Sequence, residues 1–186
     1  MKESHHEVNR RAFLGHTVLA GAAAAGLAAM PRRRAIAAND KLGVGVIGNG
    51  GRVPPTTVID DDATGDVETS GTFDATTDGI DFYESLEGMR VQVNDAVAVG
   101  PTNSFGELPV LADNGGNGAG TRTTRGGIVI QANDFNPERI ILDDAIIGTA
   151  NMPVVNVGTA FPGAILGVLD YDFGNVKLEV TGGLPA

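Results

Sequence analysis

From about Asp78 onward, apolar residues fall in short runs separated by turn-forming residues, and no stretch carries a long helical period. Such runs predict short β-strands. Glycine, asparagine and proline at 100–103, 114–118 and 173–175 predict turns between them. The expected strands are 89–93, 96–99, 108–112, 127–131, 139–142, 154–157, 165–171 and 176–180.

Only one short helix is expected in this region. Residues 81–88 suit a single helical turn, with Asp81 capping its start and Gly88 ending it. Eight short strands and one turn of helix predict a mainly β domain at 78–186. The expected fold is a small OB-like Greek-key barrel, with a β-sandwich as the alternative, after an N-terminal signal helix and an extended linker.

The first 38 residues have the features of an export signal. Arg10 and Arg11 are adjacent, Phe13 and Leu14 follow, and 17–30 is a run of small apolar residues too short to span a bilayer. This segment resembles a twin-arginine signal peptide, cleaved near residue 38. The resemblance implies the translocation machinery as a partner, a periplasmic or extracellular location, and no membrane span after cleavage. The alternative is an N-terminal amphipathic or membrane helix.

A glycine-rich turn lies in the expected linker, 39–77. The sequence 41–52 looks like the first strand and turn of a dinucleotide-binding unit. Together with the signal, it resembles the start of exported oxidoreductases of the Gfo/Idh/MocA family. That chemistry needs a helix directly after the turn, where Pro54 and Pro55 stand instead. We therefore interpret the turn as a broken Rossmann-like one, and NAD(P) binding is not expected.

The same linker concentrates carboxylates beside a glycine. Asp60, Asp62 and Asp66 offer hard oxygen ligands of the kind that Ca²⁺ prefers. Their spacing does not match an EF-hand loop, and a solvated linker is the alternative. Apart from this possible Ca²⁺, no cofactor is expected.

Composition limits the chemistry of the remaining chain. Cysteine is absent and all three histidines, His5, His6 and His16, lie in the signal segment. The rest therefore lacks a histidine base, a Ser-His or Cys-His pair and any usual zinc ligand set. Most of the acidic residues but only seven of the 13 basic ones lie beyond residue 38, so this part is more acidic than the formal charge of −10. Such a surface repels polyanions.

Several segments, in order, resemble one known family. They are 78–89, 106–110, 125–128, 136–140, 161–163 and 169–178. They look like the OB-like domain of large secreted nucleases, which precedes a catalytic domain of the endonuclease/exonuclease/phosphatase class. This chain ends about where that domain would begin, so no enzymatic activity is expected of it alone. Two resemblances from unrelated families meet near 52–56, which indicates a chimera or a mis-joined fragment.

The resemblance implies a non-catalytic accessory domain that positions nucleic acid or packs on a catalytic domain. For single-stranded nucleic acid, arginines would contact phosphates and aromatic rings would stack on bases. The candidates are Arg90, Arg122, Arg125 and Arg139 with Tyr83, together with Phe105 and Tyr171. The alternatives are arginines that pair with nearby carboxylates, an oxidoreductase remnant, or a structural spacer that binds nothing. Asp143 and Asp144 are adjacent on a strand, so an acid/base pair is not expected.

Overall fold

The structure, a computed structural model, describes residues 45–48, 51–65, 70–116 and 120–185. They belong to one compact unit, 38–186. Arg10, Arg11, Phe13 and Leu14, which are expected to belong to an export signal, lie outside the described residues, as does Asp66. No helix among the described residues is both long enough and apolar enough to cross a membrane.

Strands dominate the described part of the chain, as the short apolar runs predicted. The elements are β1 (Gly45–Ile47), α1 (Gly79–Glu84), β2 (Arg90–Ala98), β3 (Leu108–Leu111), β4 (Ile140–Asp143), β5 (Ala160–Asp172) and β6 (Asn175–Val180). Two short 3₁₀ turns, η2 (Asp113–Gly115) and η3 (Thr149–Asn151), lie in the connections.

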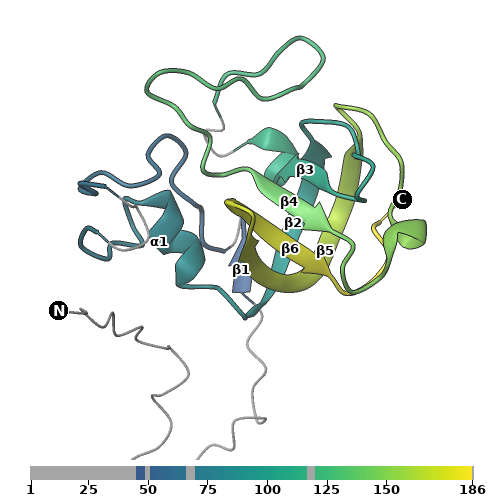
Figure 1. The fold of residues 1–186 in the computed structure, drawn as a ribbon. Helices are drawn as coiled ribbons and strands as arrows, with labels where there is room; N and C mark the ends of the chain where they lie inside the picture. The colour runs from purple at the N-terminus through teal and green to yellow at the C-terminus, as the bar shows by residue number, and fades with distance from the viewer. Residues whose placement is uncertain (1–44, 49–50, 66–69, 117–119, 186) are drawn as a thin grey trace, which may run out of the picture. The chain divides into compact units, whose positions relative to one another are not determined.

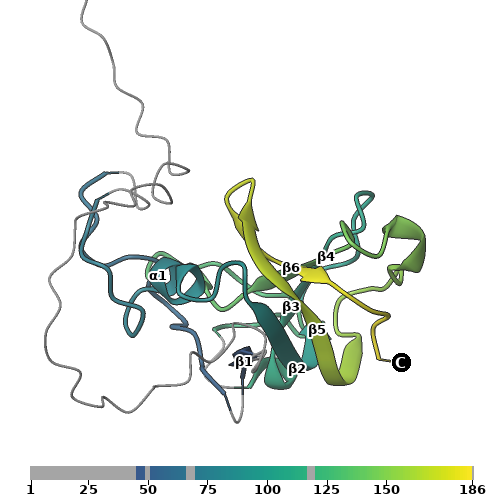
Figure 2. The same ribbon diagram turned by 90° about the horizontal axis from the view of Figure 1, so that it is seen from below.

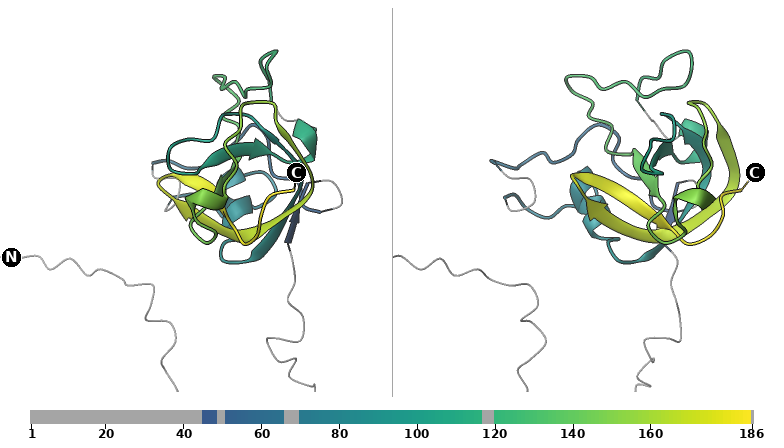
Figure 3. Two further views of the ribbon diagram at one scale, coloured as in Figure 1. Left: turned by 90° about the vertical axis from the view of Figure 1, so that its right-hand side faces the viewer. Right: turned by 45° about the vertical axis from the view of Figure 1, so that its right-hand side comes forward.

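Five strands form a closed barrel. Their order is β2-β3-β4-β6-β5, and β5 pairs back with β2 to complete the ring (Figure 3). The β4–β6 pair is parallel, and the other four pairs are antiparallel. This arrangement confirms the predicted small OB-like Greek-key barrel, and the closed sheet rules out two separate sheets packed as a sandwich.

Strand β1 adds to one edge of the barrel from a segment that the sequence analysis assigned to a linker. It runs parallel to the first half of β2, with Gly45 opposite Val91. Strand β3 pairs with the second half of β2, where Leu111 lies opposite Val97. Strand β1 therefore pairs with the part of the β2 edge that β3 does not reach. Without β1, this part of the edge would expose its backbone donors and acceptors.

The core fills the barrel with aliphatic side chains, and α1 covers one end. Alternate residues of β5 point inward, among them Phe161, Ile165 and Leu169. From α1 and the turn that follows it, Phe82, Tyr83 and Leu86 join the same cluster. The tip of the β5–β6 hairpin lies at this end of the barrel too (Figures 1 and 2).

Two of the expected strands, 89–93 and 96–99, are one continuous strand, β2. The residues between them form a β-bulge at which Asp95 has a positive φ of 45°. The Asp95 carboxylate accepts a hydrogen bond from the Gly163 backbone amide of β5 at 2.8 Å. The bulge thus bends β2 without ending it.

The expected strands 127–131 and 154–157 are not strands, because their apolar side chains pack on the barrel from outside the sheet. Ile128 covers a second, smaller cluster formed by Val97, Val99 and Leu111. Val155 packs against the main core. Its backbone exchanges hydrogen bonds with Thr102, whose amide donates to the Val155 carbonyl at 3.1 Å.

A buried lysine joins three parts of the barrel. The Lys177 ammonium on β6 lies 2.7 Å from Glu107 before β3 and 2.8 Å from Asp143 at the end of β4, and it is 3.7 Å from Asp172. Lys177 is only 5% exposed. Burial acts to lower the pKa of Lys177, but the hydrogen bonds to Asp143 and Glu107 raise it overall. The ammonium therefore stays charged and holds two carboxylates together.

Replacing Lys177 with methionine tests this interaction. The Lys177→Met variant would leave the Asp143 carboxylate buried without its cation, so we expect the free energy of unfolding to fall by about 3 kcal/mol in urea denaturation. Asp172→Asn is the control, because that carboxylate is half exposed and farther away; its effect should stay below about 1 kcal/mol. Equal losses in the two variants would contradict the argument.

Glu179, also on β6, makes stability depend on pH. Burial, together with Asp143 and Asp170, raises the pKa of Glu179 from 4.5 to about 7. The folded state then binds this proton more tightly than the unfolded state, so the contribution to stability is full below pH 4.5 and is lost between pH 4.5 and 7. Glu179→Gln should reduce that loss and be more stable at pH 8 by about 1 kcal/mol, because residual solvent contact screens the repulsion. Glu87→Gln, which removes a carboxylate at an exposed site, is the matched control in the same measurement.

Candidate functional site

A pocket of about 600 Å³ lies at the end of the barrel that α1 covers. Four segments line it: the chain before α1, α1 itself, the end of the β3–β4 connection, and the β5–β6 hairpin. The lining residues are Thr57, Val58, Ile59, Asp60, Gly79, Ile80, Tyr83, Asn133, Phe135, Asn136, Pro137, Arg139, Tyr171, Gly174, Asn175 and Val176. The volume falls within the range of small-molecule sites in proteins.

The wall before α1 is fixed by backbone hydrogen bonds. The first amides of α1, on Gly79 and Ile80, donate to the carbonyls of Val58 and Ile59 at 3.1 Å each. These bonds satisfy donors that have no partner within a helix. On the other side, the Phe135 amide donates to the Thr57 carbonyl at 3.3 Å. The segment 57–59 is thereby held between α1 and the β3–β4 connection.

Three aromatic rings line the pocket. Tyr83 is 4% exposed, whereas Tyr171 and Phe135 are 38% and 50% exposed. The buried Tyr83 hydroxyl has no hydrogen-bond partner among the described residues. Burial and the nearby Glu138 carboxylate raise the pKa of Tyr83, so its hydroxyl stays protonated and can donate. The rings of Phe135 and Tyr171 provide exposed stacking surface, and the buried Tyr83 hydroxyl is an unused polar group.

Arg139 supplies the positive charge in the pocket. It is half-buried at the start of β4, and its guanidinium donates to the Asn175 side-chain oxygen at 2.7 Å across the pocket. This bond links the β3–β4 connection to the β5–β6 hairpin. It uses one of the five donors of the guanidinium and leaves others to bind an acceptor.

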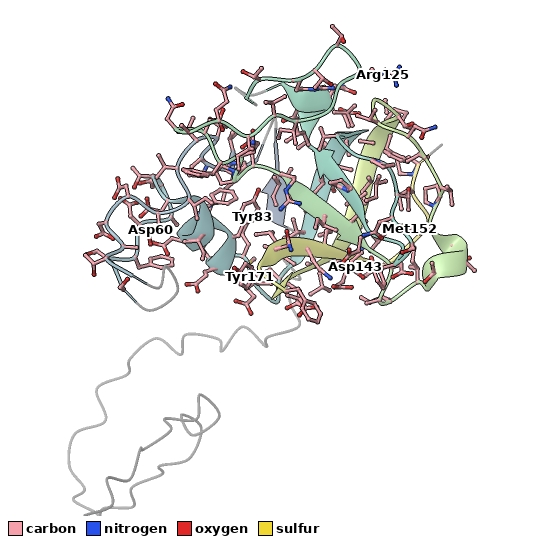
Figure 4. All side chains as sticks on the ribbon, turned by 45° about the horizontal axis from the view of Figure 1, so that its top comes forward. Asp60, Tyr83, Arg125, Asp143, Met152 and Tyr171 are labelled. Carbon is pink, nitrogen blue, oxygen red and sulfur yellow. The ribbon has the colours of Figure 1, made fainter. Side chains whose placement is uncertain are left out.

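The structure brings Arg139, Tyr83 and Tyr171 together in one pocket but separates the other predicted arginines from them. Figure 4 shows Tyr83 and Tyr171 at one end of the domain and Arg125, which is exposed, well apart from them. Arg90 is exposed at the start of β2. Arg122 donates to the backbone carbonyls of Gly126 and Asn114 at 3.1 Å each, so it stabilises its own loop through carbonyls and not through the carboxylates that the alternative expected. Among the described residues, these arginines do not form one basic groove.

Asp60 and Asp62, two of the three expected metal ligands, do lie together, and buried Asp78 joins them. Their carboxylate oxygens are within 4.8 Å of one another. Burial, followed by the charge of Asp61, raises the pKa of Asp78. Each carboxylate also accepts backbone amide bonds: Asp60 from residues 62 and 63, Asp62 from Thr72, and Asp78 from Asp61. These bonds account for the fold of the acidic loop.

The glycine turn after β1 has a structural role in the described residues. The Arg52 amide donates to the Val46 carbonyl at 2.8 Å, and the Gly51 amide donates to the Gly48 carbonyl at 2.9 Å. No helix occurs among residues 51–65, so the turn lacks the free amides of a dinucleotide site. Its last residue, Arg52, bonds the Ser85 hydroxyl at 2.6 Å and lies 4.7 Å over the Phe82 ring.

Sequence reasoning missed the amide side chains of the pocket. The sequence placed Asn175 in a turn and gave Asn133 and Asn136 no role, but all three residues line the same cavity. The aromatic Phe135 between two of them was the only signal that could have separated this turn from the others.

The fold and the pocket define a small closed β-barrel domain with a ligand-sized cavity at one end. The chain belongs to the family described as Domain of unknown function (DUF8508), whose model matches residues 46–186. The match includes α1 and all five barrel strands. No curated protein and no solved structure matches the chain.

Gly79 sets how closely α1 approaches the pocket wall. A Cβ at this position would lie 2.4 Å from the Pro137 Cβ and 3.1 Å from the Val58 carbonyl oxygen. Although alanine favours helices, Gly79→Ala should lower the free energy of unfolding by about 1–3 kcal/mol because α1 must move away. Gly182→Ala, which adds a Cβ in open space, is the control in the same thermal or urea denaturation. If the free energy of unfolding of Gly79→Ala equals that of the unaltered chain, the pocket wall moves to accommodate the Cβ and the prediction is wrong.

Proposed function

We propose that this chain is a non-catalytic accessory domain that binds an unpaired base of single-stranded nucleic acid in the pocket at the α1 end. The observation that carries the proposal is the joint presence of Tyr83, Tyr171 and Arg139 in one cavity. Stacking on aromatic rings, with one guanidinium for a phosphate or a base edge, is how such modules hold single strands. The hairpin that bears Tyr171 corresponds to a loop that OB barrels often use for ligands.

The charge of the domain limits the binding mode. With a formal net charge of −10 for the chain and its arginines scattered, the surface does not favour a long strand that follows a basic groove. A single base held in the pocket needs only one positive group near it. We therefore expect weak binding of short oligonucleotides, with a shallow dependence on salt.

The chain contains two tyrosines and no tryptophan, so its intrinsic fluorescence reports on the pocket alone. A labelled single-stranded hexanucleotide, added to the full chain at low salt, should show saturable fluorescence anisotropy and quench the tyrosine emission. Tyr171→Ala should weaken binding about tenfold through lost stacking. Phe173→Ala is the matched control, since this ring is on the same hairpin, is 90% exposed and does not line the pocket.

A second matched pair separates the pocket from general charge. Arg139→Met and Arg125→Met remove the same charge, but only Arg139 lines the pocket. We expect the first to weaken binding about tenfold and the second to change it less than twofold. Absence of saturable binding, or equal loss in both variants, would contradict the proposal and favour a structural spacer or a domain that packs on a partner.

A further inference from the structure

Three polar side chains just before β4 are buried although the rest of their connection is largely exposed. Asp134, Asn136 and Glu138 occupy alternate positions, and they are 8%, 6% and 6% exposed. Together they offer up to five oxygen atoms and two negative charges. Burying such groups is costly unless each finds a partner.

The three side chains converge on Gly120, at the other end of the same loop. A Cβ on Gly120 would lie 2.3 Å from Asp134 Oδ2 and 3.0 Å from Asn136 Oδ1. Glu138 Oε1 accepts a hydrogen bond from the Gly120 amide at 3.3 Å. The Asn136 side-chain nitrogen donates to the Val129 carbonyl at 3.3 Å, which turns its oxygen toward Gly120. The oxygens thus face one space that only a glycine leaves open.

Two of these oxygens have no partner. Asn136 Oδ1 and Glu138 Oε2 are fully buried and accept no hydrogen bond among the described residues. Neither Asp134 nor Glu138 forms an ion pair within the described part of the chain. Leaving such acceptors unsatisfied costs about 1–3 kcal/mol each, and more for a charged group. A bound cation would remove this cost at Asn136 and Glu138. The Asp134 carboxylate, whose Oδ1 accepts the Asn136 backbone amide at 3.2 Å, would add its negative charge to the site.

We propose that Asp134, Asn136 and Glu138 form a Ca²⁺ site beside Gly120. Carboxylate and amide oxygens are the ligands that Ca²⁺ takes, and water or backbone carbonyls would complete its shell of six to eight. Mg²⁺ fits less well because it retains several waters and seldom enters a buried protein site. The site is separate from the Asp60–Asp62–Asp78 cluster, in which no buried carboxylate oxygen lacks a hydrogen-bond partner.

Such an ion would fasten Gly120 to the last part of the long β3–β4 connection. Gly120 lies in this connection after η2, and residues 134–138 lead into β4. Asn136 and Pro137 also line the pocket. Ca²⁺ binding should therefore stabilise the domain and the pocket wall, whether or not the pocket binds nucleic acid.

Terbium luminescence tests the site directly. Tb³⁺ replaces Ca²⁺ at oxygen sites and is excited through nearby tyrosine, and Tyr83 is close enough to feel the Glu138 charge. The metal-free full chain should show saturable, tyrosine-excited Tb³⁺ emission that Ca²⁺ displaces and Mg²⁺ at equal concentration does not. Ca²⁺ should also raise the melting temperature by several degrees, as a ligand of the folded state does.

Three variants decide between the two acidic clusters. Glu138→Gln and Asp134→Asn each keep the side-chain shape and should weaken Ca²⁺ binding about tenfold or more. The double variant D60N/D62N should bind Ca²⁺ as the unaltered chain does. The far-ultraviolet circular dichroism of each variant reports whether the barrel is retained. One single variant that retains the barrel is enough for the test of Ca²⁺ binding. No saturable Tb³⁺ or Ca²⁺ binding, or loss only in D60N/D62N, would overturn the proposal.

Discussion

Closure of the barrel depends on β5, which pairs with β2 along one edge and with β6 along the other. Gly167 makes this possible, because a Cβ there would lie 2.5 Å from the Glu179 carbonyl oxygen. The bulge at Asp95 supplies the matching bend in β2. Once the ring is closed, α1, the β3–β4 connection and the β5–β6 hairpin meet at one end. The pocket exists because these segments have no other place to pack.

Most of the charged side chains described above stabilise the fold. Lys177 joins β6 to the starts and ends of neighbouring strands through Glu107 and Asp143. Arg122 and Arg52 stabilise a loop and α1 by bonding polar oxygens. Of the six basic residues that the structure describes, only Arg139 lines the large cavity. This distribution is the physical reason for proposing that a ligand is held at one point and not along a groove.

The sequence predicted the barrel class well, because the short apolar runs at 108–112, 139–142 and 176–180 are largely buried strands bounded by turn-forming residues. It failed at 127–131 and 154–157, where Ile128 and Val155 bury apolar surface without entering the ladder. A single sequence does not distinguish these two ways of packing. The site was predicted only through Tyr83, Tyr171 and Arg139, since the asparagines of its wall depend on how distant loops meet.

Most of the pocket wall comes from connecting segments, whereas the barrel strands supply only its edge. Substitutions at Asn133, Phe135 or Ile59 would alter what the cavity accepts while the inward faces of β2, β5 and β6 stay as they are. Relatives with the same barrel can therefore diverge in the molecules they recognise without any loss of foldability. Selection can act on the rim and on the scaffold independently.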